Sequence, residues 1–170
     1  MKFSRLPVVV IGAGPVGLAA AAHLVQRGET PLVLEAGQTI GASMLAWGHV
    51  QLFSPWRYVV DTAAEKLLAY AGWVAPLPEH YPTGRELVEQ YLAPLAALPA
   101  IAPHLRLGHR VEAVARHGFD KMKTDGREQA PFVVEVEVAD GRTEHLLANL
   151  NDCVVAPAEA KVPKLQTPQP

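Results

Sequence analysis

The fold is decided by residues 8–17, Val8-Val9-Val10-Ile11-Gly12-Ala13-Gly14-Pro15-Val16-Gly17, together with residues 32–35, Leu32-Val33-Leu34-Glu35. Four aliphatic residues predict a strand, and the alanine-rich run after the glycines predicts a helix. The second apolar run predicts another strand, which ends in an acid. A strand, a glycine turn, a helix and an acid-ended strand are the arrangement that holds a dinucleotide.

Each glycine of this turn has a distinct expected role. Gly12 permits the tight turn out of the strand, and Gly14 lets the backbone approach a pyrophosphate because it has no Cβ. Gly17 allows the helix to pack closely against the strand. The free N–H groups at the helix start then face the phosphates. Glu35 follows Gly12 by about twenty residues, where its carboxylate accepts hydrogen bonds from both ribose hydroxyls.

Two plainer interpretations of the same stretch explain it less well. A glycine turn with only a packing role does not explain the acid-ended second strand. A membrane helix over residues 8–25 is interrupted by three glycines, Pro15 and His23. Neither a basic flank nor a small-residue cleavage site precedes the stretch. The sequence therefore predicts no signal or membrane anchor, and a cytoplasmic protein.

The composition is that of a folded domain. The chain has 170 residues, of which 49% are hydrophobic and 19% are charged, with a formal net charge of −2. This is too apolar for a disordered protein, and no basic stripe suggests nucleic acid. The single cysteine, Cys153, lies in an apolar run, which predicts a buried strand residue and excludes a disulfide within the chain.

The rest of the chain divides into predicted helices, strands and loops. Strands are expected at 6–11, 31–35 and 105–107, and helices at 14–27, 62–71 and 83–92. Gly28 is the expected C′ cap of the first helix. Asp61 and Thr83 are the expected N-caps of the second and third helices, and Glu86 completes a capping box with Thr83. Residues 37–60 are expected to be irregular, and Pro94, Pro99 and Pro103 are expected to break the stretch that follows the third helix.

Three stretches then alternate at a period of two: residues 110–116, 132–138 and 143–147. Asp140-Gly141 between the last two is a hairpin signal, so the three predict an antiparallel meander. Residues 152–156 predict a strand that returns to the parallel sheet. We therefore expect an α/β fold with domain boundaries at 1–156, a meander at about 110–148, and a loose proline-rich tail over 157–170.

This combination resembles the superfamily of flavoproteins with two dinucleotide-binding domains. Residues 9–18, VVIGAGPVGL, and 33–36, VLEA, are similar to its FAD signature. Residues 51–58 and 81–87 fall where the flavin-containing monooxygenase-like members have an aromatic loop and a helix start. The resemblance implies a Rossmann-like FAD/NAD(P)-binding three-layer fold, FAD as cofactor and NAD(P)H as co-substrate. It implies a small-molecule substrate, and neither nucleic acid nor a membrane as partner.

The resemblance also implies roles for individual residues. The pyrophosphate would lie against Gly12, Gly14, Pro15, Val16 and Gly17. Glu35 would bind the adenosine ribose, Ala36 would lie beside the adenine, and backbone groups at Val111 would meet the adenine. Ser43 and the aromatic residues 53–58 would approach the flavin end. Those aromatic residues could equally form a small core beneath the long loop.

The sequence lacks the residue patterns that several other enzyme chemistries require. A dithiol reductase of this superfamily needs a cysteine pair soon after the acidic residue, and none is present. The seven histidines show no metal-ligand spacing, and no Ser-His-Asp set can be assigned. Asp140-Gly141-Arg142 has the letters of a hydroxylase motif, but its position favours a hairpin turn. No catalytic residue is predicted.

One departure from the family pattern bears on function. Ala156-Pro157-Ala158 stands where the superfamily usually has Ala-Thr-Gly, and proline and alanine there would weaken a backbone contact with FAD. The second glycine motif, for NADPH, is absent from the chain. Two hypotheses follow: an FAD-dependent oxidoreductase of monooxygenase type using NAD(P)H and O₂, represented by its FAD-binding half, or a non-catalytic or truncated nucleotide-binding module.

Overall fold

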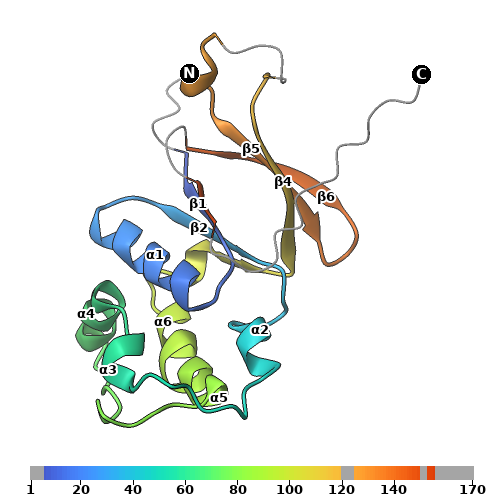
Figure 1. Ribbon diagram of the computed structural model, residues 1–170. Coiled ribbons are helices and arrows are strands. Elements are labelled where there is room, and N and C mark those ends of the chain that lie inside the picture. Colours follow the sequence, from blue (N-terminus) through green and yellow to red (C-terminus); the bar gives the residue numbers. More distant parts are fainter. Residues whose placement is uncertain (1–5, 120–124, 150–152, 156–170) are drawn as a thin grey trace.

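A parallel sheet forms the centre of the molecule in the computed structural model, which describes residues 6–119, 125–149 and 153–155 (Figure 1). Its strands are β1 (Val8–Ile11), β2 (Pro31–Glu35), β3 (Leu105–Leu107) and β7 (Cys153–Val155), in the order β3-β2-β1-β7. Val8 pairs with Pro31, Val9 with Cys153 and Val33 with Leu105. The predicted strands and their parallel arrangement are confirmed.

Helix α1 (Pro15–Gln26) connects β1 to β2 across one face of the sheet. Pro15 occupies its first position, where a missing N–H is harmless. At the other end Gly28, at φ 75°, donates to the Val25 carbonyl at 3.0 Å, and Glu29 donates to the Leu24 carbonyl at 3.0 Å. This pair of bonds is a Schellman motif, and it confirms the predicted cap at Gly28.

The remaining helices lie on the same side of the sheet as α1 (Figure 1). They are α2 (Ala42–Leu45), α3 (Trp56–Val59), α4 (Thr62–Tyr70), α5 (Gly84–Leu87), the π-turn η2 (Val88–Leu92), α6 (Ala93–Ala96) and the 3₁₀ turn η3 (Ala102–His104). Asp61 caps α4 and the Thr83–Glu86 capping box begins α5, as predicted. The expectation that residues 37–60 are irregular is wrong at α2 and α3. Each is a single helical turn, too short to show a periodic pattern.

The prediction that Pro94 breaks the stretch after residue 92 is also wrong, because helical structure continues to Ala96. A proline removes the hydrogen bond to the carbonyl four residues earlier and crowds it. Here the wider π-turn η2 precedes Pro94. The Gln90 carbonyl, which Pro94 cannot bond, accepts the indole N–H of Trp73 at 2.8 Å. A side chain distant in sequence therefore satisfies the group that the proline leaves free.

The antiparallel meander covers the other face of the sheet (Figure 1). Strands β4 (His109–Arg116), β5 (Phe132–Val138) and β6 (Thr143–Ala148) pair in the order β4-β5-β6, and the 3₁₀ turn η4 (Arg127–Gln129) precedes β5. Gly141, at φ 84°, lies in the hairpin between β5 and β6, and Val138 donates to the Arg142 carbonyl at 2.8 Å. The predicted meander and its Asp140-Gly141 turn are confirmed.

The sheet is covered on both faces, which explains why its strands are continuously apolar. Val10 and Val33 belong to the larger core, with α1 and the other helices. Val9 and Leu34 belong to a smaller core that includes Val134 and other residues of the meander. Neighbouring residues of a strand point to opposite faces, so one apolar run serves two cores. The three-layer Rossmann-like fold is thereby established.

Some predictions fall on residues outside the described ranges. These are the tail over 157–170 and the Ala156-Pro157-Ala158 departure. Cys153 lies in β7, as expected for a strand residue. Among the described helices, none has the length and apolarity needed to cross a membrane.

Candidate functional site

The glycine turn leaves the carboxyl end of β1 and enters α1. Gly12 has φ 96°, a conformation that favours glycine, and its N–H donates to the Leu34 carbonyl at 2.7 Å. This bond ties the turn to the end of β2, so the two strand ends that the sequence singled out lie next to each other.

Gly14 and Gly17 are glycines for different reasons. A Cβ at Gly17 would lie 1.9 Å from the Gly12 carbonyl oxygen, so only glycine lets α1 approach the turn this closely. A Cβ at Gly14 would meet no protein atom within 4 Å. The space in front of Gly14 is therefore open to a ligand, whereas the space beside Gly17 is filled by the protein.

The start of α1 presents backbone donors without a side-chain cap. Gly14 is the N-cap, and no side chain accepts from the first turn of the helix. The N–H groups of Val16 and Gly17 lie before Leu18, whose N–H donates to the Gly14 carbonyl at 3.0 Å, and they have no partner within the helix. Val16 is 57% exposed. An anion placed here would meet free donors and the positive end of a helix of 12 residues.

The Glu35 carboxylate is held by backbone N–H groups from two loops. Ala13 donates to Oε2 at 2.7 Å and Gly37 donates to Oε1 at 2.8 Å. Each carboxylate oxygen has more than one acceptor direction, so both retain capacity for a further donor such as a ribose hydroxyl. The side chain is thus oriented before any ligand arrives.

Two further glycines, for which the sequence predicts no binding role, hold neighbouring segments against this region. Gly41, at φ 61°, donates to the Ala13 carbonyl at 3.2 Å, which brings α2 and its exposed Ser43 to the glycine turn. Gly108 donates to the Gly37 carbonyl at 2.9 Å, which brings the start of β4 to the loop after Glu35. Gly41, which closely follows Glu35, was the available signal, whereas Gly108 lies far along the chain and gave none.

The predicted site residues therefore fall into two groups. Gly12, Gly14, Pro15, Val16 and Gly17 surround one turn, and Glu35 and the exposed Ala36 lie at the adjoining end of β2. Val111 lies in β4, half-buried against the meander-side core, just before a β-bulge between Val111 and Ala113. The binding roles of all these residues stay predictions.

The aromatic residues after β2 do not act as one cluster. Trp56 is 2% exposed and belongs to the helical core, as the packing alternative expected. Phe53 is 94% exposed and Tyr58 is 69% exposed, so neither is part of a core. The resemblance implies that these aromatic residues contact the flavin. Of the three, only Phe53 and Tyr58 are exposed enough to contact a ligand.

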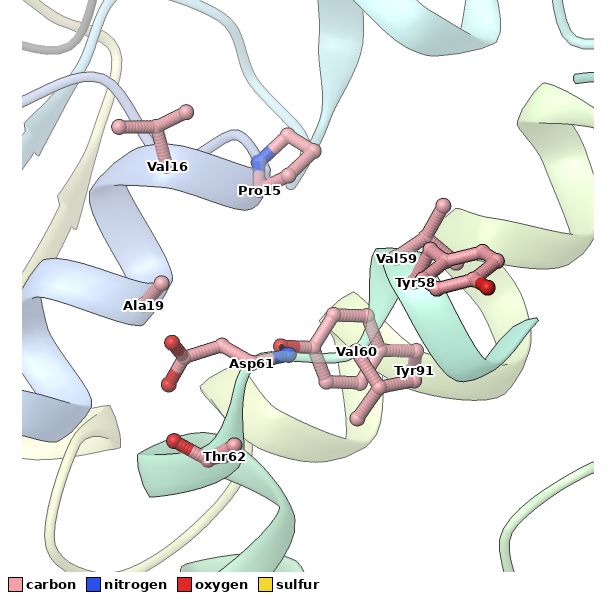
Figure 2. A pocket seen from close by; sticks show the side chains of 9 residues that line it. All are labelled: Pro15, Val16, Ala19, Tyr58, Val59, Val60, Asp61, Thr62 and Tyr91. Carbon is pink, nitrogen blue, oxygen red and sulfur yellow. Dashed lines mark hydrogen bonds between the residues drawn. The ribbon is translucent and has the colours of Figure 1, made fainter. Parts of the chain in front are cut away.

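A pocket of about 420 Å³ adjoins the glycine turn. Its walls come from the start of α1 and from the segment that joins α3 to α4, as Figure 2 shows, and its lining residues are Pro15, Val16, Ala19, Tyr58, Val59, Val60, Asp61, Thr62 and Tyr91. The sequence predicts Asp61 only as a helix cap, and it predicts no role for Tyr91. No local pattern marks a residue that lines a pocket through tertiary packing.

Asp61 is the most heavily bonded side chain of the pocket. It accepts hydrogen bonds from the N–H groups of Ala63 and Ala64, and it lies 3.1 Å from Nε2 of His23. Burial alone would raise the pKa of Asp61, but the bonds from Ala64, His23 and Ala63 outweigh it and lower that pKa below its ordinary value. Its own N–H donates to the Tyr91 hydroxyl at 3.1 Å.

Elsewhere in the described part of the chain, no group of three His, Cys, Asp or Glu side chains is placed to hold a metal ion. Arg142 of the Asp140-Gly141-Arg142 stretch contacts Asp140, with Nε 2.6 Å from Oδ2. That contact stabilises the hairpin itself.

Comparison with known proteins places this geometry in context. The family model for pyridine nucleotide-disulphide oxidoreductases matches residues 9–134. Indole-3-pyruvate monooxygenase YUCCA1 of Oryza sativa subsp. japonica is 34% identical over 125 residues, which are 71% of this chain and 28% of that protein. The chain therefore spans little more than a quarter of that relative.

Solved structures share the fold. The bacillithiol disulfide reductase Bdr (YpdA) from Bacillus cereus matches with a TM-score of 0.62 and 27% identity, over 84% of this chain and 37% of that one. The OTEMO structure in complex with FAD and NADP matches with a TM-score of 0.58 and 22% identity, over 84% of this chain and 24% of that one. At 22% identity, the similarity to the OTEMO structure concerns the fold alone.

Proposed function

Because the chain belongs to the pyridine nucleotide-disulphide oxidoreductase family, we propose that it supplies the FAD-binding part of an FAD-dependent oxidoreductase of monooxygenase type. The observation that carries the proposal is the pair of glycines in the turn. Gly17 is required by packing, whereas Gly14 faces open space next to uncapped backbone donors. A glycine that the fold itself does not need, at a helix start, suits the close approach of a phosphate.

The residues of this chain fit the ADP half of FAD. The N–H groups at the start of α1 would hold the pyrophosphate, and the oriented Glu35 carboxylate would accept from the ribose hydroxyls. Ala36 and the backbone at Val111 would lie beside the adenine. When bound, FAD supplies hydride acceptance and reaction with O₂, and the protein supplies position and orientation.

The monooxygenase assignment has two supports. The rice relative is a monooxygenase and is 34% identical to this chain. The chain has no cysteine pair after Glu35, so it offers no dithiol at the position where the reductases of the superfamily carry theirs. NAD(P)H as the reductant, and a small organic molecule as the acceptor of one oxygen atom, complete the proposal.

The alternative is a nucleotide-binding module without turnover of its own. The chain spans 28% of the rice protein and 24% of the OTEMO chain, and its residues contain no second glycine motif for NADPH. Both candidates predict FAD binding. They differ in whether NADPH reduces the bound flavin.

The experiment is reconstitution of the purified chain with FAD, followed by removal of free cofactor and a visible absorption spectrum. We expect flavin absorbance that stays with the protein, and its absence in a correctly folded sample would refute the proposal. Anaerobic addition of NADPH then separates the two candidates, because only a working reductive half-reaction bleaches the flavin.

Gly14→Val tests the site itself. We expect complete loss of FAD binding with an unchanged circular dichroism spectrum, since the added side chain fills ligand space and meets no protein atom close to its Cβ. Ala69→Val is the control, because it introduces the same β-branched side chain at an exposed position of α4. FAD binding that survives Gly14→Val would contradict this placement of the pyrophosphate.

A further inference from the structure

The pocket beside α1 extends away from the turn that we assign to the pyrophosphate. Pro15, Val16 and Ala19 form one wall, and the segment from Tyr58 to Thr62 forms the wall opposite (Figure 2). The volume of about 420 Å³ is within the range of small-molecule sites in proteins. Pro15 and Val16 border both this space and the proposed pyrophosphate site, whereas Ala19 and residues 58–62 take no part in the proposed contacts with the ADP half.

A buried hydroxyl lies against this pocket with its own hydrogen uncommitted. Tyr91 is 1% exposed, and its oxygen accepts the Asp61 N–H at 3.1 Å. Within the described ranges, no residue accepts the hydrogen of the hydroxyl. Burial raises the pKa of Tyr91, so the group stays protonated at neutral pH and keeps this hydrogen to donate.

Tertiary contacts fix the position of Tyr91. The residue lies in the π-turn η2, a rare conformation that is frequent at functional sites. The Trp73 ring lies 6.2 Å from the Tyr91 ring, centroid to centroid, and the Trp73 indole N–H bonds to the Gln90 carbonyl. The hydroxyl is therefore pre-oriented, and a ligand that meets it gains a hydrogen bond with little further ordering.

The remaining lining selects against an anion. Pro15, Val16, Ala19, Val59 and Val60 offer apolar surface. Figure 2 shows the Asp61 carboxylate directed toward α1, and three donors already occupy it, from Ala63, Ala64 and His23. Asp61 thus adds negative charge to the pocket but offers few free acceptor positions to a ligand.

We propose that this pocket binds a small uncharged organic molecule whose carbonyl oxygen accepts the Tyr91 hydroxyl hydrogen and whose apolar body lies against α1. A neutral acceptor satisfies the uncommitted hydrogen of the buried Tyr91 hydroxyl, and it avoids the Asp61 charge. The site goes beyond the proposed function and does not require bound FAD.

The test uses three probes of similar size with the full chain. Acetophenone carries the carbonyl, ethylbenzene has a methylene in its place, and benzoate carries a charge. Binding is followed by chemical-shift changes in ¹⁵N–¹H spectra, with the Asp61 and Thr62 amides as reporters. We expect a dissociation constant on the order of 1 mM for acetophenone. Ethylbenzene should bind about fivefold more weakly, the value of one neutral hydrogen bond, and benzoate more weakly still.

Variants assign the effect to the pocket. Tyr91→Phe should weaken acetophenone binding about fivefold relative to ethylbenzene, because it removes the hydrogen bond to the carbonyl. The Asp61 N–H loses its acceptor at the same time, which affects both probes alike. Tyr70→Phe, at a position 92% exposed on α4, is the matched control and should change neither. Ala19→Leu fills the pocket from α1 without altering Tyr91 and should weaken both probes.

The outcomes are decisive even if Tyr91→Phe fails to fold, because Ala19→Leu and the wild-type probe series remain. Equal affinity of the wild-type chain for acetophenone and ethylbenzene would overturn the proposal, as would full binding by Ala19→Leu. Gly14→Val separates this proposal from the proposed function, since it should abolish FAD binding and leave acetophenone binding intact.

Discussion

The glycine turn that leads into α1 and the segment that leads into α4 border the same pocket, yet they are built by contacts of different range. In the turn, Gly12 and Gly17 are five positions apart and their contact sets the approach of α1. In the other segment, Trp56 donates to the His80 carbonyl at 2.9 Å, and Asp61 donates to Tyr91, which is 30 positions away.

The difference explains which of the two regions can be interpreted from sequence. A contact between near neighbours constrains residue types at a fixed spacing, so it leaves a motif. A contact with a distant residue leaves none, because the partner can lie anywhere along the chain. Substitutions in the two regions should therefore differ in how far their effects can be anticipated.

The largest effect is expected at Gly17. Gly17→Ala would place a Cβ 1.9 Å from the Gly12 carbonyl oxygen, and a backbone atom cannot move aside as a side-chain tip can. We expect the free energy of unfolding to fall by on the order of 4 kcal/mol, measured by urea denaturation.

Gly14→Ala is the matched control in the same turn. Its Cβ meets no protein atom within 4 Å, so the only expected loss is a less favourable N-cap, within about 1 kcal/mol. Equal destabilisation by the two substitutions would contradict the division of roles within the turn.

The next effect concerns the aromatic residues of the second region. Trp56→Ala removes a side chain that is 2% exposed and should lower the free energy of unfolding by about 3–4 kcal/mol. Phe53→Ala removes a side chain that is 94% exposed and should change it by less than about 0.5 kcal/mol. Similar losses in thermal denaturation would show that Phe53 is packed in solution.

The smallest effect is electrostatic and depends on pH. Asp61→Asn keeps an N-cap of similar shape but removes the charge that His23 and the α4 amides stabilise. At pH 7 the wild type should be more stable by about 1 kcal/mol. The pKa of Asp61 lies below 3.8 in the folded state, so this advantage is complete above that pH and is lost as pH falls through the lowered pKa.

Urea denaturation of both proteins between pH 7 and pH 2 checks this prediction. The wild-type and Asp61→Asn curves should converge at the acid end. A difference that is constant across the whole range would show that the carboxylate charge contributes nothing.

Much of the fold could be predicted from the sequence because local patterns specify it. The apolar strands, the Schellman cap at Gly28, the Thr83–Glu86 capping box and the Asp140-Gly141 hairpin all depend on residues within six positions of one another. Alternating stretches likewise predicted the meander, because a half-buried strand needs apolar residues at every second position.

The predictions from sequence fail where contacts between residues distant in the chain decide the structure. Pro94 does not end its helix because the Trp73 indole bonds the carbonyl that the proline leaves free. Phe53 and Trp56 are both aromatic and lie three positions apart, yet one is exposed and the other buried. Composition could not separate them, since burial depends on what the rest of the chain places around each side chain.

The sequence by itself determined the glycine turn, the acid-ended second strand and the layers that follow them, because each depends on short-range sterics and on the period of apolar residues. Only the tertiary structure decided that Gly17 is fixed by packing while Gly14 faces open space, and that Tyr91 lines a pocket with α1. Those properties depend on which atoms occupy the space beside a residue, and that space is filled by parts of the chain far away in sequence.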